Sequence, residues 1–167
     1  WLVGFLVFQA YPILISAYYS LTDFNLFQAP RWVGLANYRL LFSDERFYKS
    51  LYNTLYMTVF GVPLSLLVAL LCALALNMEV KGQPVYRALV YLPTVVPVVA
   101  ATYLWRWLLN AQYGYVNQLL GLLGLPQPLW LDDAAWTKPA LILMGLWLVG
   151  GTTIIYLAAL KEVPKVY

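Results

Sequence analysis

Few side chains of this sequence could carry out catalysis, and their spacing does not favour it. The chain has no His, which excludes imidazole catalysis, and its single Cys, Cys72, lies in an apolar run, so we expect a buried and inert thiol. One Cys cannot form a disulfide framework. The adjacent acids Asp132 and Asp133 lack a third ligand, so we interpret them as a cap for the turn 134–138 rather than as a metal site. The only Lys–Gly pair, at 81–82, has the reverse of the P-loop order, so no ATP-binding pattern is present.

The side chains best suited to contact a polar solute are two adjacent hydroxyls, Thr152 and Thr153, in the uncharged stretch 139–160. Three glycines reduce the bulk around them: Gly145, Gly150 and Gly151. Two interpretations stay open. The hydroxyls either donate back to carbonyls of their own helix, or they offer hydrogen bonds to a solute that passes at mid-membrane.

Two prolines in the stretch 88–109 indicate a second unusual helix. Pro93 and Pro97 stand four residues apart, and each removes a backbone donor, so the helix should bend or break there. Broken helices often line a transport path, because irregular backbone survives at membrane depth only beside protein or water. A kinked helix with a purely structural role is the alternative.

Four uncharged stretches must position these residues. They contain no Asp, Glu, Lys or Arg, and they are 22, 29, 18 and 22 residues long: 1–22, 50–78, 88–105 and 139–160. A helix needs about 20 mostly apolar residues to cross a bilayer. We therefore predict an all-α, polytopic membrane helical bundle with transmembrane helices at about 1–21, 51–77, 88–109 and 139–160.

The overall composition supports this fold class. Hydrophobic residues make up 63% of the 167 residues and charged residues only 10%, which argues against a disordered chain and against an ordinary soluble domain. The net charge is +3 and the ten basic residues are scattered, so nucleic acid is not an expected partner. The bilayer is.

The connections should contain short interfacial helices. We expect one or two in 23–49, where residues 43–47 offer an N-cap followed by acidic first-turn residues, with a solvated loop as the alternative. A further short helix is expected at 115–123. Gly82 and Pro84 predict a turn in the second connection.

Small residues recur every four positions in the second apolar stretch, at Gly61, Ser65, Ala69 and Ala73. They share one helix face, and such a face lets membrane helices approach closely. We interpret it as a packing seam against helices outside this sequence or against a partner subunit. Chance in an Ala- and Leu-rich helix is the alternative.

Several short strings give the chain a family resemblance. They occur in one order along the whole sequence: YP (11–12), SLTD (20–23), WVGLANY (32–38), NT (53–54), LP (92–93), GYVN (114–117) and LKEVPK (160–165). In this order the sequence resembles the permeases of carbohydrate ABC importers, of the maltose and glycerol-phosphate transporter type. We read the chain as the N-terminal fragment of such a permease, with four of its six core helices.

The resemblance also implies the other components of the transporter. It implies a second permease subunit, two cytoplasmic ATPase subunits, an extracytoplasmic solute-binding protein and a sugar substrate. It places the protein as a multi-pass protein in the cytoplasmic membrane of a bacterium or archaeon, neither an enzyme itself nor bound to a cofactor. Lys81 and Lys161 should face the cytoplasm, which the density of basic residues in their short stretches also favours.

The resemblance also suggests functional positions. Sugar contacts of the maltose-type relatives fall on Val98, Gly145, Leu148, Val149 and Thr152. Of these only Thr152 keeps a hydrogen-bonding side chain, so the sugar is not identified. The approach to the helix that couples to the ATPase falls on Lys161, Glu162, Val163, Pro164, Lys165 and Tyr167.

Two other classes compete with a permease subunit. One is an ATP-independent helical membrane channel or structural membrane bundle, which would need no coupling segment. The other is an intramembrane enzyme, which the missing His and the inert setting of Cys72 disfavour.

Overall fold

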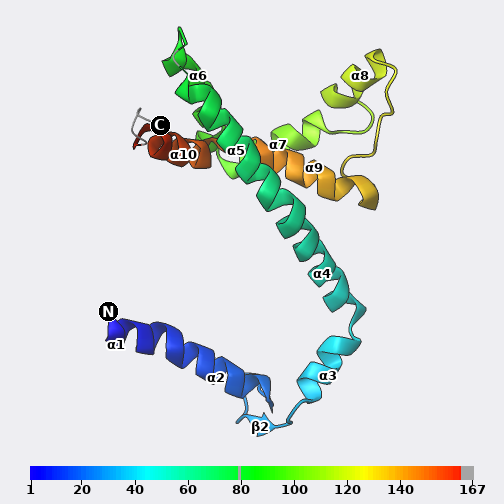
Figure 1. The fold of residues 1–167 in the computed structure, drawn as a ribbon. Helices are drawn as coiled ribbons and strands as arrows, with labels where there is room; N and C mark the ends of the chain where they lie inside the picture. The colour runs from blue at the N-terminus through cyan, green and yellow to red at the C-terminus, as the bar shows by residue number, and fades with distance from the viewer. Residues whose placement is uncertain (79, 163–167) are drawn as a thin grey trace. The chain divides into compact units, whose positions relative to one another are not determined.

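A computed structural model describes residues 1–78 and 80–162. The chain divides into two compact units, Trp1–Asn53 and Thr54–Tyr167. Both units are helical, and a short antiparallel pair of two-residue strands occurs in the first. The predicted all-α class is confirmed (Figure 1).

The first unit opens with one continuous apolar helix, Leu2–Ser20. It is assembled from α1 (Leu2–Phe5), the π-helical segment η1 (Leu6–Ala10) and α2 (Tyr11–Ser20). The π-helical turn directly precedes Pro12, which has no N–H and whose ring crowds the carbonyl four residues earlier. The wider turn accommodates that ring, and the helix continues past Pro12.

A small polar network closes the end of this helix. Three short elements follow it: β1 (Thr22–Asp23), β2 (Arg31–Trp32) and α3 (Ala36–Ser43). The side-chain amide of Asn37 donates to the carbonyls of Ser20 and Thr22, each at 2.9 Å. The hydroxyls of Ser20 and Tyr38 are 2.8 Å apart. Because helix C-termini leave carbonyls without partners, Asn37 satisfies groups that the helix itself cannot.

The helix α4 (Glu45–Tyr56) begins where the sequence predicted an N-cap. The Asp44 carboxylate accepts from the backbone N–H of Arg46 at 2.8 Å, and Glu45 is the acidic residue of the first turn. The Ser43 hydroxyl belongs to the preceding helix and donates to the Leu40 carbonyl at 2.9 Å.

The second unit contains the remaining helices. After α4, in which the unit boundary falls, they are η2 (Met57–Gly61), α5 (Val62–Asn77), α6 (Gln83–Val95), α7 (Val98–Leu108), α8 (Tyr115–Leu122), α9 (Ala134–Leu146) and α10 (Gly150–Glu162). From α4 to α5 the helix is continuous over Glu45–Asn77, and a π-helical turn again precedes a proline, Pro63. Gly82, at a φ of 82°, forms the predicted turn before α6.

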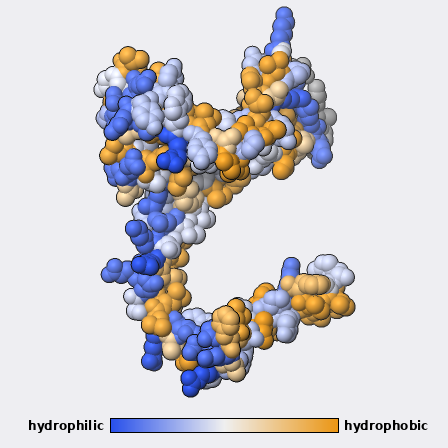
Figure 2. Space-filling view, turned by 180° about the vertical axis from the view of Figure 1, so that it is seen from behind, coloured by the Kyte–Doolittle hydropathy of each residue, from blue (hydrophilic) through white to orange (hydrophobic). Residues whose placement is uncertain are grey.

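Two helices are long and apolar enough to cross a membrane, Leu2–Ser20 and Glu45–Asn77. The pairs α6–α7 and α9–α10 pass the same test together but are bent by 99° and 49°, so the described residues hold up to four spans. No residue of the described helix Leu2–Ser20 is buried. Hydrophobic residues are spread over the outer surface (Figure 2), as expected of a protein whose solvent is lipid.

The face of small residues is partly buried, with Ala69 and Ala73 fully covered, and its contacts are to this chain's own helices. In the core of the second unit, Ala73 and Leu76 of α5 pack against Leu157 of α10. A Cβ placed on Gly61 would lie 3.6 Å from a side-chain carbon of Ile142 in α9. The predicted partner, a helix outside this sequence or another subunit, was therefore wrong for Gly61 and Ala73. Their small size lets α9 and α10 approach the long helix.

A buried amide organises the loop between α7 and α9. Asn117, in the expected short helix α8, is 3% exposed. Its amide nitrogen donates to the carbonyls of Ala111 (3.2 Å) and Pro128 (3.1 Å), and its oxygen accepts from the Trp130 indole at 2.8 Å. The predicted cap is also confirmed, because the Asp133 carboxylate accepts from the N–H of Ala135 at 2.9 Å.

Candidate functional site

The predicted break in the third apolar stretch occurs between α6 and α7. Val96 and Pro97 are extended, with ψ angles of 128° and 135°. A residue before proline is pushed out of the helical region, and Pro97 cannot donate a helical hydrogen bond, so the two effects coincide here. Pro93 stays inside α6, so Pro97 rather than Pro93 ends the helix.

The fourth stretch is also broken, between α9 and α10. Residues 147–149 form a turn, in which the N–H of Leu148 donates to the Gly145 carbonyl at 3.0 Å. Gly150 then begins α10. Gly145 and Gly150, two of the three glycines of this stretch, thus lie at the two ends of the interruption.

The two breaks lie beside each other in the second unit. Gly150 packs against the backbone of α6 one turn before that helix ends. A Cβ added to Gly150 would collide with the Val90 carbonyl oxygen and lie 3.1 Å from the Cα of Tyr91. The rings of Trp105 in α7 and Trp147 meet edge to face, with centroids 6.0 Å apart. Only glycine permits this approach of α10 to α6.

The residues expected to contact sugar lie at or beside these breaks. Val98 is the first residue of α7 and is 76% exposed. Gly145 and Leu148 are exposed, and a Cβ on Gly145 would meet nothing within 4 Å. Val149 is buried, so its side chain does not face open space. A role of these residues in binding stays a prediction.

The two threonines behave differently. Thr153 is fully buried and its hydroxyl donates to the Val149 carbonyl at 3.0 Å, which is the local interaction that membrane threonines often make. Thr152 is half-buried, and its hydroxyl has no hydrogen-bond partner among residues 1–78 and 80–162. The two interpretations left open by the sequence therefore divide between neighbouring residues, and only Thr152 is available to a solute.

Trp105 is a polar group that the sequence analysis missed. Its indole nitrogen is buried, and in the described part of the chain it has no acceptor. An unpaired buried donor costs free energy, so this N–H would be stabilised by donating to a polar acceptor. Its sequence context, beside the exposed Arg106, gave no signal of burial.

The predicted coupling approach is only partly described. Lys161 and Glu162 form the exposed end of α10. Val163, Pro164, Lys165 and Tyr167 lie outside the described residues. Among the residues that the structure does describe, no group of His, Cys, Asp or Glu could hold a metal ion.

The proteins that this chain resembles in sequence are transport permeases, which agrees with the interrupted apolar helices described above. No protein-family model matches the chain. The chain is 39% identical to the probable ABC transporter permease protein YesP of Bacillus subtilis, over 99% of this chain and 54% of that protein. It is 30% identical to the trehalose/maltose transport system permease protein MalF of Thermococcus litoralis, over 96% of this chain and 55% of that protein. The chain thus spans about half the length of the curated relatives it matches.

The fold agrees with the sequence relationship. A crystal structure of a bacterial alginate ABC transporter, in complex with a periplasmic protein bound to alginate pentasaccharide, superposes with a TM-score of 0.76. The identity is 25%, and the match covers 98% of this chain and 55% of the other. The named relatives are membrane transport subunits and not enzymes themselves. In sequence and in fold, this chain is homologous to about half of an ABC transporter permease, of the kind found in sugar importers.

Proposed function

We propose that this chain forms part of the translocation pathway for a sugar or related polar solute in a binding-protein-dependent ABC importer. The observation that carries the proposal is the apposition of two interrupted apolar helices at Gly150, in a chain related to sugar permeases. The membrane concerned is the cytoplasmic membrane of a bacterium or archaeon.

The breaks supply what a polar solute needs. A sugar that enters hydrocarbon loses its hydrogen bonds to water, at a cost of several kcal/mol for each unpaired group. The end of α6 presents backbone carbonyls that no longer have helical donors, and the free hydroxyl of Thr152 lies beside the neighbouring break. A Cβ on Gly145, on the other side of the second break, would meet nothing within 4 Å, so space is free around that residue. Together these groups can replace part of the lost hydration.

The energy must come from other chains. The sequence has no ATP-binding pattern, so we assign hydrolysis to two cytoplasmic ATPase subunits and delivery of the solute to an external binding protein. A second permease subunit completes the pathway, and this chain needs no cofactor. Residues 161–167 lead to the segment that contacts the ATPase. Closure of the ATPase pair would rock the helices and expose the site to each side in turn.

The two threonines provide a matched test. Thr152→Val removes the free hydroxyl and keeps the side-chain shape, whereas Thr153→Val removes a hydroxyl that bonds only to its own helix. One lost hydrogen bond is worth about 0.5–1.5 kcal/mol, so Thr152→Val should weaken solute binding about two- to tenfold. Thr153→Val should leave it unchanged.

The measurement is uptake of radiolabelled maltose, trehalose and alginate oligosaccharides by the full-length, assembled transporter, with solute-stimulated ATP hydrolysis recorded in parallel. Thr152 leaves the proposed site if both variants match the unsubstituted protein. Uptake that persists without the ATPase subunits would support the ATP-independent channel instead.

A further inference from the structure

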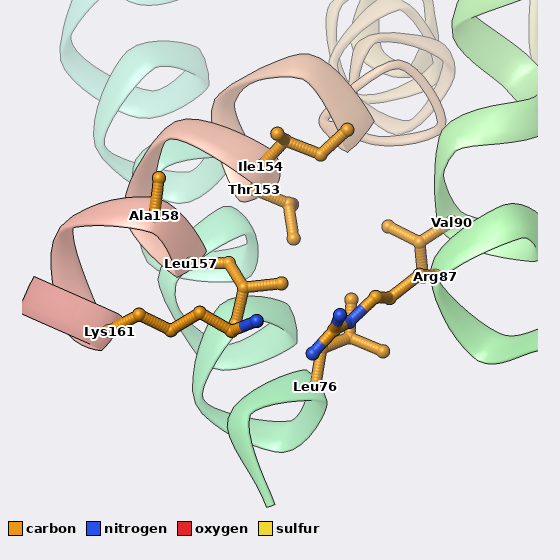
Figure 3. A pocket seen from close by; sticks show the side chains of 8 residues that line it. All are labelled: Leu76, Arg87, Val90, Thr153, Ile154, Leu157, Ala158 and Lys161. Atoms are coloured by element: carbon orange, nitrogen blue, oxygen red, sulfur yellow. The ribbon is translucent and has the colours of Figure 1, made fainter. Parts of the chain in front are cut away.

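A cavity of about 310 Å³ lies between α5, α6 and α10 in the second unit (Figure 3). Most of its wall is apolar and includes Leu76, Val90 and Leu157. Ile154 and Lys161 also line it and are exposed, so the cavity opens onto the protein surface.

Two cations enter this apolar space. Arg87 from the start of α6 and Lys161 from the end of α10 extend into it from opposite sides (Figure 3). Neither forms an ion pair with any described residue, and no acidic side chain lines the cavity. The Arg87 Nε atom is buried and lacks a hydrogen-bond partner within the described ranges. A buried guanidinium nitrogen without an acceptor is costly, so an anion in the cavity would be stabilised.

The combination of charge and wall selects the class of anion. A liquid water occupies about 30 Å³, so the cavity has room for about ten, which is more than a lone inorganic anion needs. A phosphodiester fits the two cations, and an acyl chain fits the apolar wall. Basic pockets between membrane helices on the cytoplasmic side suit the head groups of anionic lipids.

We propose that this cavity binds an anionic phospholipid, with Arg87 and Lys161 holding the phosphate and with acyl methylenes against Leu76, Val90 and Leu157. The inference depends on the proposed function for one point, namely that Lys81 and Lys161 lie on the cytoplasmic side of the membrane. A lipid at this place would join α6 to the end of α10, where the proposed approach to the coupling segment begins at Lys161.

The test measures binding, and not transport. The full-length, assembled transporter in detergent is titrated with dioleoyl phosphatidylglycerol or dioleoyl phosphatidylcholine, and retained lipid is counted by native mass spectrometry. Arg87→Gln and Lys161→Gln should each weaken retention of phosphatidylglycerol about fivefold. Lys81→Gln is the matched control, since Lys81 lies at the same end of the unit but does not line the cavity. Phosphatidylcholine retention should not respond to any of the three.

Three results would overturn the proposal. The first is equal phosphatidylglycerol retention in all variants. The second is displacement of the lipid by millimolar inorganic phosphate, which would assign the site to the free anion. The third is a fall in thermal stability of Arg87→Gln that is the same with and without phosphatidylglycerol, which would indicate a protein carboxylate in the cavity. Lys161→Gln, at an exposed helix end, keeps the test valid if Arg87→Gln fails to fold. A transporter that imports no sugar would still give the lipid result, so the two proposals fail separately.

Discussion

The close approach of α10 to α6 predicts that one glycine cannot be replaced while its neighbour can. In Gly150→Ala the new methyl group would collide with the Val90 carbonyl oxygen and stand 3.1 Å from the Cα of Tyr91. Both obstacles are backbone atoms, which cannot rotate away as a side chain would. The helices must therefore separate, or the substitution must distort α6.

Gly151→Ala is the control that measures the energetic cost of the collision at Gly150. A Cβ on Gly151 would meet nothing within 4 Å, and both glycines belong to the first turn of α10. Replacing either with Ala brings a similar gain in helix propensity, up to about 1 kcal/mol. The difference between the two variants is then the steric term alone, about 1–3 kcal/mol for an overpacked contact.

The assay compares thermal unfolding of Gly150→Ala and Gly151→Ala in the same detergent. A domain of this size loses about 2–4 °C for each kcal/mol, so Gly150→Ala should unfold several degrees below Gly151→Ala. Uptake should fall in Gly150→Ala as well, because the two helix breaks would no longer meet. Equal midpoints for the two variants would refute the close approach and, with it, the apposition of the breaks.

Two further predictions concern the polar groups that hold α8 and α9. Asn117→Ala leaves the half-buried Trp130 indole without its acceptor, and it also leaves the carbonyls of Ala111 and Pro128 without their donor, so it should lower stability by about 1–3 kcal/mol. Gln118→Ala removes only an exposed hydrogen bond and should change little, and equal thermal midpoints for the two variants would contradict the role of the Asn117 network. Asp133→Ala removes the N-cap of α9 and should lower the free energy of unfolding by about 1 kcal/mol in the same thermal assay. The control is Asp132→Ala, at the exposed neighbour, and a larger loss of stability in that control would contradict the assignment of the cap.

Local chemistry explains why much of the fold could be predicted. The uncharged stretches indicated the long helices. In hydrocarbon the backbone N–H and C=O groups must bond to one another, so a run of about 20 apolar residues forms a helix there. The break at Pro97 needed only the missing N–H of proline and the restriction that it places on Val96. Asp133 could be placed as a cap because the interaction spans two residues.

Contacts between distant segments could not be predicted in the same way. The periodicity of Gly61 and Ala73 indicated a packing face but carried no information on which helix would cover it. Thr152 and Thr153 are chemically identical, and only the packing around α10 buries one and leaves the other available.

The sequence by itself determined that the chain is helical, with long apolar helices and one interruption near Pro97, because chain composition and proline geometry act over a few residues. Only the tertiary structure decided that Gly150, at the second interruption, packs against α6 about one turn before the first, and that Arg87 and Lys161 share one cavity. Those pairings depend on the crossing of α6, α5 and α10, which is set by the packing of side chains far apart in the chain and is written in no local pattern.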